Sequence, residues 1–305
     1  MCFFKKTNVP TLEELLTAIL QPTSSMDIIG DSTHREIASE GIIDDDGDGS
    51  ILYHLKLYIL QLFQNRNNAI VNEFIGFRFY NIDNGDVLDH LIQQIRTNSL
   101  YISSINFNDV IDPLLSVYIN KKKRGNRQNR RWFKLLSEAM DGMRVSCFCP
   151  EKMHFNRTHI NSIENHLMWA HYANKHSGLC IKYRIKPEAI NKYNQPDSFC
   201  FLAKVQYSNK NIKLQDITLD DALVQKSLIW EYENEYRLIY FSTLENKEST
   251  ICINDIIPEA IYLGAKISDS NRAKILKELK KLHIPIFQMA IDYNDMIKLT
   301  PKTIK

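Results

Sequence analysis

The sequence has few glycines, few cysteines and no long apolar run, and each shortage excludes a class of protein. Ten glycines in 305 residues are too few for a glycine-rich linker or a repeat protein. No stretch approaches the roughly 20 apolar residues that a membrane-spanning helix needs, so we expect no membrane association. The six cysteines are scattered and too few for a disulfide scaffold, which predicts reduced thiols in a cytoplasmic protein.

Charge and short motifs exclude further functions. Lys and Arg number 38 and Asp and Glu 36, and this near balance gives no support to a protein that binds polyanions over its whole surface. No Gly-x-Gly-x-x-Gly or phosphate-loop motif is present, which argues against Rossmann and P-loop enzymes. The Gly-x-Ser-x-Gly nucleophile elbow is also absent. The lysines at positions 5 and 6 follow a short apolar run, the reverse of the order in a secretory signal, so we expect none.

The chain is predicted to contain two parts. Residues 1–73 indicate a small helical appendage, which could recruit a partner or a second copy of the chain. Residues 74–305 alternate between strand and helix patterns and predict an α+β domain, with a mixed, mostly antiparallel sheet and flanking helices. We expect strands at 74–82, 100–103, 144–149, 179–183, 204–207, 235–242, 259–263 and 286–291, and helices at 86–97, 128–141, 162–176 and 270–282.

The densest group of functional side chains lies in the predicted helix 162–176. Trp169, Tyr172 and His176 fall at three- and four-residue steps and share one face, whereas His171 points elsewhere. Indole, phenol and imidazole rings can stack on a flat ligand and donate hydrogen bonds, which suits a nucleotide. The alternative is an aromatic face packed into the core.

A second group lies near residue 235. If this segment is extended, Glu231, Glu233, Glu235 and Arg237 lie on one face of a strand. Like charges in a row are tolerated at a solvated edge. They also occur in acid–base sites, because one Glu can raise the pKa of its neighbour. Both interpretations remain open.

Two further positions could contact a polar ligand. Arg78 and Tyr80 lie on the same side of the first predicted strand, where the Arg fork could clamp a phosphate or carboxylate. Asn108 and Asp109 follow the strand 100–103, where they either build a turn or contact the ligand.

A basic run could bind nucleic acid. Seven Lys and Arg residues occur within residues 121–131, and Trp132 and Phe133, which could add stacking, follow at once. The alternative is a mobile basic loop. The seven residues are Lys121, Lys122, Lys123, Arg124, Arg127, Arg130 and Arg131.

No metal site is predicted. The spacing of the neighbouring cysteines and histidines matches no familiar zinc pattern. The residues concerned are Cys147, Cys149, His154, His159, His166 and Cys180.

Three motifs taken in order resemble a known family. They are Leu100–Ser103 with Phe107–Asp109, then Met168–Ala173 with His176 and Gly178–Ile181, then Trp230 with Tyr232–Glu233 and Glu235–Ile239. Together they resemble the bacterial domain-of-unknown-function family two-nine-seven-one, with its Trp-x-His-Tyr-Ala-x-x-His-x-Gly core. The resemblance covers residues 74–293 and leaves the N-terminal residues outside. It implies no established activity.

The order of elements is also similar to that of ADP-ribosyltransferases. Those enzymes open with a strand that carries Arg or His, and they place a Glu-x-Glu just before a late strand. The analogy implies an NAD-dependent ADP-ribosyltransferase-like enzyme, a toxin or phage-defence effector, with a nucleic acid or a protein as acceptor. Glu235, Glu233 and His171 would be catalytic, and NAD would contact Arg78, Tyr80, Asn108, Asp109, Trp169, Tyr172 and His176.

Two other classes of function stay open. One is a non-catalytic module that binds nucleic acid or a partner through the basic run. The other is a metal-dependent nuclease or hydrolase that uses Asp109, His171 and a carboxylate.

Overall fold

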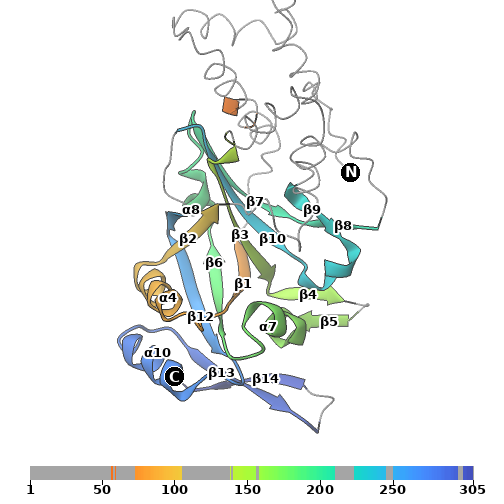
Figure 1. Cartoon of the computed structure of the whole chain (residues 1–305), viewed down its shortest axis with the longest axis vertical. Helices are drawn as coiled ribbons and strands as arrows, with labels where there is room; N and C mark the ends of the chain where they lie inside the picture. The colour runs from red at the N-terminus through yellow and green to blue at the C-terminus, as the bar shows by residue number, and fades with distance from the viewer. Residues whose placement is uncertain are drawn as a thin grey trace, which may run out of the picture. The chain divides into compact units, whose positions relative to one another are not determined.

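The computed structural model describes residues 56–57, 59, 73–104, 138, 140–155, 158–209, 223–244, 250–294 and 298–304. The chain divides into two compact units, one of residues 1–66, 106–142 and 210–223 and the other of residues 67–105, 143–209 and 224–305. Nearly all described residues belong to the second unit, whose elements are coloured in Figure 1. The predicted appendage of residues 1–73 lies almost wholly outside the described residues, and its boundary stays a prediction.

The second unit is built from strands with a few short helices. Its helices are α4 (Gly85–Thr97), α7 (His166–Tyr172), α8 (Pro187–Asn191) and α10 (Asp269–Glu278), with 3-10 turns η1 (Ser162–Glu164) and η3 (Leu228–Glu233). Its strands are β1 (Phe74–Tyr80), β2 (Ser99–Ser104), β3 (Met143–Pro150), β4 (Lys152–Phe155), β5 (Thr158–Asn161), β6 (Leu179–Ile185), β7 (Ser198–Lys204), β8 (Gln206–Ser208), β9 (Gln225–Ser227), β10 (Tyr236–Ser242), β11 (Thr250–Asn254), β12 (Ile256–Leu263), β13 (Ile286–Asp292) and β14 (Lys298–Thr303).

Ten of these strands form one mixed sheet. Eight follow the order β11-β2-β3-β1-β6-β12-β13-β14, and β10 and β7 join through β3. The pair β12–β13 is parallel, and the other described pairs in this sheet are antiparallel. The predicted fold class, α+β with a mostly antiparallel sheet, is therefore confirmed.

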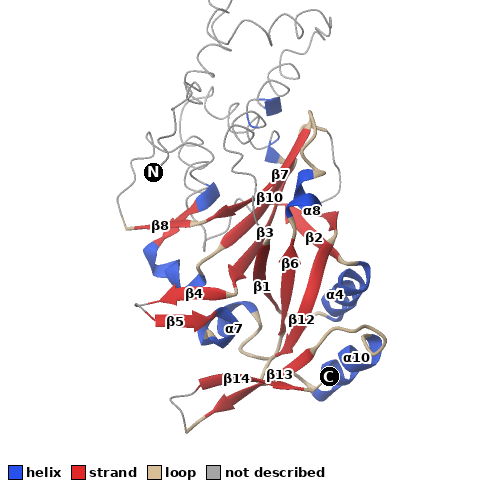
Figure 2. Ribbon diagram, turned by 180° about the vertical axis from the view of Figure 1, so that it is seen from behind, coloured by secondary structure: helices blue, strands red, loops and turns tan. Residues whose placement is uncertain are grey.

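Strand β3 is the branch point of the sheet, whose strands are drawn in red in Figure 2. Along one edge it pairs with β10. Along the other edge β2 pairs with Val145 and Arg144, whereas β1 pairs with Cys149 and Pro150. Among the described strands, residues 146–148 have no ladder partner on that edge, so β1 and β2 diverge there and leave a fork.

The two faces of the sheet bury different clusters. In β6 the alternate residues Leu179 and Ile181 pack with α4 on one face, whereas Cys180 packs with α7 on the other. Alternation of this kind follows from the two-residue period of a strand. Helix α4 faces its cluster with Leu88, Leu91, Ile92 and Ile95, and burying each such side chain contributes about 1.5–3 kcal/mol.

The predicted helix 162–176 is too long. The Asn165 side chain accepts a hydrogen bond from the Leu167 N–H at 3.0 Å and caps α7. Helix α7 ends at Tyr172, because residues 174–176 adopt left-handed backbone angles, with φ of 43°, 52° and 73°. Outside glycine this conformation costs roughly 1–2 kcal/mol per residue. A tertiary contact holds the turn, since the Lys266 N–H donates to the carbonyl of His176 at 2.8 Å.

Candidate functional site

Four charged side chains are buried together beside β10. Lys226 Nζ lies 2.6 Å from Glu233 Oε2 and 3.2 Å from Glu235 Oε2. Arg237 Nε lies 2.8 Å from Glu235 Oε1. All four side chains are less than a tenth exposed. We call Lys226, Glu233, Glu235 and Arg237 the charge network. Its formal charges cancel, which makes its burial tolerable.

Strand register and one turn bring these residues together. In the parallel pair β8–β9, Tyr207 is the partner of Lys226. In the antiparallel pair β3–β10, Cys147 is the partner of Arg237. The segment 231–237 is not one extended strand, because η3 runs to Glu233 and Asn234 turns the chain with φ 43°. The one-face arrangement considered for an extended segment therefore does not occur, and β10 begins at Tyr236, close to the start of the predicted strand 235–242. Asn adopts this left-handed conformation more readily than most residues.

Hydroxyl and thiol groups surround the charge network. The Tyr172 hydroxyl donates to Glu233 Oε1. The backbone N–H of Glu235 donates to the Tyr207 hydroxyl at 2.8 Å. The Cys147 thiol also hydrogen-bonds Glu235, yet Cys147 is exposed. Cys147 therefore marks where the charge network comes close to solvent.

The two carboxylates have pKa values displaced in opposite directions. Burial raises the pKa of Glu233 against the opposing pull of Lys226. Burial acts the same way on Glu235, but the Arg237 guanidinium and the Lys226 ammonium together outweigh it and hold the pKa of Glu235 at about 2. Glu235 is thus an anion at neutral pH, whereas Glu233 keeps its proton to a higher pH than an ordinary Glu. Such separation is typical of acid–base sites.

The surrounding donors stay protonated. Burial, reinforced by Glu233, raises the pKa of Tyr172, so its hydroxyl remains a donor to that carboxylate. The Cys147 side chain reaches solvent, but its thiol is closely surrounded by the protein; this desolvation raises the pKa of the thiol, and the charge of Glu235 adds to the effect. Burial lowers the pKa of Lys226, but the Glu235 and Glu233 carboxylates outweigh it and the net shift is upward.

Three rings form a cluster, and one of them contacts Lys226. The ring centroids of His171, Trp230 and Tyr232 are 6.1 Å (His171–Trp230), 6.2 Å (His171–Tyr232) and 5.9 Å (Trp230–Tyr232) apart. The Lys226 ammonium lies 5.1 Å from the centroid of the Trp230 ring, a cation–π contact. We call His171, Trp230 and Tyr232 the aromatic cluster.

Arg78 lies at the fork between β1 and β2. Its Nη1 donates to the carbonyl of Tyr101 on β2 at 3.4 Å, and its guanidinium lies 5.0 Å from the centroid of the Tyr80 ring. The Tyr80 hydroxyl pairs with that of Tyr183 at 3.0 Å. The Arg78 charge also acts on the Cys147 thiol, so the two side chains approach the fork from different strands.

Two predicted ligand contacts have other roles in the structure. Trp169 is fully buried, and its indole N–H donates to the carbonyl of Ile163 at 2.8 Å. It offers no exposed face for stacking on a cofactor, which corrects that prediction. His176 follows the end of α7 and stacks on Trp169, with centroids 6.1 Å apart and an interplanar angle of 10°. It therefore does not share a helical face with Tyr172.

The other predicted residues divide into three groups. Tyr172, Glu233 and Glu235 lie together in the structure, and His171 lies at their edge in the aromatic cluster. Arg78 and Tyr80 lie at the fork. Outside the described residues lie Asn108 and Asp109 and the basic run Lys121, Lys122, Lys123, Arg124, Arg127, Arg130 and Arg131.

Sequence reasoning missed Lys226, Tyr207 and Cys147 as parts of this site. Lys226 stands alone between Gln225 and Ser227, and no spacing links it to Glu233. Only the pairing of β8 with β9 turns Lys226 inward beside Tyr207. The mixture of apolar and charged residues in the segment 225–237 was the signal available in the sequence, and it does not identify the partner of Lys226.

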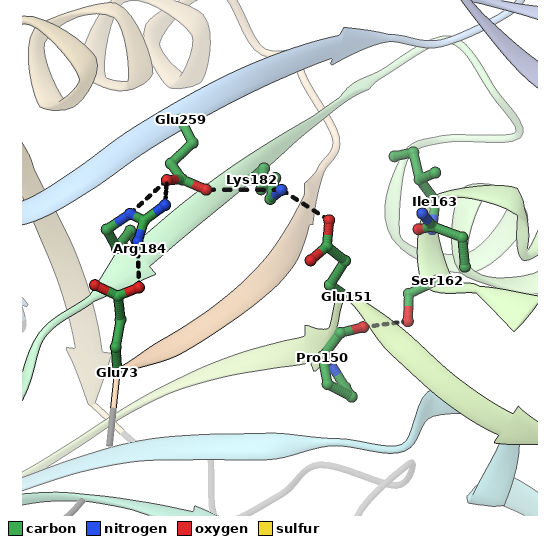
Figure 3. Close-up of polar contacts among 9 residues, drawn as sticks. Glu73, Pro150, Glu151, Ser162, Ile163, Lys182, Arg184 and Glu259 are labelled. Atoms are coloured by element: carbon green, nitrogen blue, oxygen red, sulfur yellow. Dashed lines mark hydrogen bonds and ion pairs between the residues drawn. The ribbon is translucent and has the colours of Figure 1, made fainter. Parts of the chain in front are cut away.

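A second charged cluster lies elsewhere on the sheet. Figure 3 shows that Glu259 of β12 forms ion pairs with both Lys182 and Arg184 of β6. Glu151 extends the row at 2.8 Å from Lys182 Nζ, and Glu73 extends it from Arg184. The register of β12 on β6 shifts between Pro258 and Ala260, as at a β-bulge, beside Glu259. These side chains are partly exposed, so their ion pairs are screened by solvent and contribute little to stability.

Two kinds of feature are absent from the described part of the chain. No three or more His, Cys, Asp or Glu side chains there lie close enough together to hold a metal ion. None of the helices described there is long and apolar enough to cross a membrane.

Residues 168–238 match the sequence model of a family described as "Protein of unknown function (DUF2971)". The match begins in α7 and ends in β10, so it contains Tyr172, the aromatic cluster and the charge network. It agrees with the resemblance drawn from the motifs, although it spans a smaller part of the chain. No curated protein and no solved structure matches the chain.

Proposed function

We propose that this protein is an NAD-dependent ADP-ribosyltransferase-like enzyme whose active centre is the charge network. One observation carries the proposal: Glu233 and Glu235 are buried side by side with pKa values displaced in opposite directions. Burying four charges contributes little to stability compared with apolar packing. A buried group of strongly perturbed carboxylates therefore favours a catalytic role over a structural one.

The two carboxylates suit the two tasks of the reaction. When the bond between nicotinamide and ribose breaks, the ribose gains positive charge, and a fixed anion nearby lowers the energy of that state. Glu235 is such an anion at neutral pH. Glu233 would take a proton from the acceptor in its carboxylate form, since its raised pKa brings it closer to neutral pH. Tyr172, which donates to Glu233, would fix the orientation of that carboxylate.

The basic groups at the fork fit the diphosphate of NAD. Arg78 and Arg237 both act electrostatically on the exposed Cys147. Planar guanidinium groups bind phosphates in a bidentate manner. Arg78 would hold the diphosphate, with Tyr80 supporting its guanidinium through the ring contact. A ligand would therefore reach Glu235 from the Cys147 side.

Purified protein tests the proposal directly. Release of nicotinamide from NAD is followed by chromatography for the wild type and for Glu235→Gln. Because Glu235 supplies the anion, we expect the variant to lose 100-fold or more of the rate. Glu231→Gln is the matched control, since Glu231 lies in the same segment but is exposed.

Folding must be separated from chemistry in this experiment. Glu235→Gln loses buried ion pairs, so its thermal unfolding is measured beside that of the wild type. Glu233→Gln provides a second variant, which keeps the Glu235 anion and is expected to bind NAD. Equal nicotinamide release by the wild type and a folded Glu235→Gln protein, or release that a chelator abolishes, would contradict the assignment.

The biological setting remains a proposal of the same kind. A toxin or phage-defence effector in the cytoplasm would have NAD available to it. An acceptor that is modified only in infected or toxin-exposed cells would support that setting.

A further inference from the structure

The aromatic cluster is accessible from outside. His171 is exposed and Trp230 is partly buried, whereas the neighbouring Ile229 is 73 % exposed. Two of the three rings, His171 and Tyr232, are inclined by only 31° to each other. Rings gathered at such separations present flat faces and edges on which another ring can stack.

The polar groups around the cluster are not all used within the protein. The Tyr232 hydroxyl is buried and has no hydrogen-bond partner among the described residues. A buried hydroxyl without a partner is costly, and a ligand can remove that cost. The His171 imidazole adds an exposed donor and acceptor at the rim.

The charge beside the cluster selects the kind of ligand. Because the Lys226 ammonium already lies over the Trp230 ring, a cationic side chain such as arginine would meet a like charge there. A neutral flat ring avoids that repulsion. A nucleobase is such a ring, and its polar edges can pair with the Tyr232 hydroxyl and the His171 imidazole.

We propose that His171, Trp230 and Tyr232 form a binding site for a nucleobase, presented by a free nucleotide or by a single strand of nucleic acid. Stacking on aromatic side chains is how proteins hold unpaired bases. The site needs neither NAD nor Glu235, so it goes beyond the transferase activity proposed above and can be tested without it.

Calorimetric titration tests the site with nucleoside monophosphates and with short single-stranded oligonucleotides of each base. Trp230→Ala should weaken binding about 5- to 150-fold, the loss expected for one stacked base. Trp230→Phe keeps a ring and should weaken it less. Tyr293→Ala is the matched control, because it removes an aromatic ring that is 76 % exposed and lies outside the cluster.

The outcomes separate the possibilities. Trp230-dependent binding of mononucleotides supports a free nucleotide as the ligand, and binding of oligonucleotides alone supports a strand. Equal binding by the wild type and a folded Trp230→Ala protein overturns the site, as does the absence of binding to either ligand. Preference for an arginine amide over nucleotides also overturns it. Glu235→Gln should bind as the wild type does, so a failure of the transferase proposal leaves this result interpretable.

Discussion

Replacing Lys226 with Met should expose how strongly the charge network depends on its central cation. Lys226 is 5 % exposed and pairs with two carboxylates, at 2.6 Å and 3.2 Å. Methionine has a similar length but no charge, so the variant buries Glu233 without its cationic partner. Removing one partner of a buried ion pair costs about 3–5 kcal/mol. We expect the free energy of unfolding to fall by that amount at pH 7.5.

The loss should depend on pH in a defined direction. The folded-state pKa of Glu233 is already raised by burial, and it rises further once the ammonium is gone. Because the folded state then prefers the protonated carboxyl, the variant is least destabilised at low pH and loses stability as pH rises through the folded pKa. As the pH falls from 8 to 5, the difference in the free energy of unfolding between the variant and the wild type should therefore become smaller. Glu235 stays ionised in this range, since its Arg237 partner remains.

Urea denaturation followed by circular dichroism measures both effects. Lys192→Met is the control, because Lys192 forms an exposed pair with Asp255 at 2.5 Å and should cost less than about 1 kcal/mol. Two results would refute the reasoning and show that the charge network is hydrated. One is a fall in the free energy of unfolding of less than about 1 kcal/mol for Lys226→Met at pH 7.5. The other is a difference in that free energy between variant and wild type that does not change with pH.

Three further predictions follow from single features. The Cys147 thiol is exposed but has a raised pKa. It should therefore react with iodoacetamide at pH 7.5 more slowly than the exposed Cys252, which peptide mass spectrometry can measure. Faster labelling of Cys147 would contradict the direction of its pKa shift. Gly178→Ala should destabilise the protein by about 1–3 kcal/mol or more in thermal unfolding, because its Cβ would collide with the carbonyl oxygen of Tyr80. The pKa of Glu235 is about 2 against an ordinary 4.5, so this carboxylate contributes on the order of 3 kcal/mol above pH 4.5. That stability should be lost as pH falls from 4.5 toward 2, and acid titration of unfolding would check it.

The central strands could be predicted because their residues alternate between two buried or half-buried faces. In β6, Leu179, Ile181 and Tyr183 serve one cluster and Cys180 the other, and the two-residue period carries that information locally. The end of α7 could not be predicted in this way. Its left-handed turn is held by the Lys266 N–H, a contact 90 residues away along the chain.

The candidate site was predictable only in part, for a similar reason. In the sequence, Glu233 and Glu235 can be recognised as part of a short acidic run. Tyr172 can be recognised from the motif that contains it. Their partner Lys226 depends on strand register and on a 3-10 turn that reverses the chain at Asn234. Periodicity is a local property of sequence, whereas register between distant strands is set by the whole fold.

The branched sheet has a consequence for how the chain folds as it is synthesised. Strand β2, which starts at residue 99, pairs with β11, which ends at residue 254, and β1 pairs with β6 about 100 residues later. Contacts between such distant segments require large loops to close before any energy is gained. The edge of β2 thus stays uncovered until most of the chain has left the ribosome. An open strand edge favours aggregation, so the nascent chain carries this hazard until β11 has been made and pairs with β2.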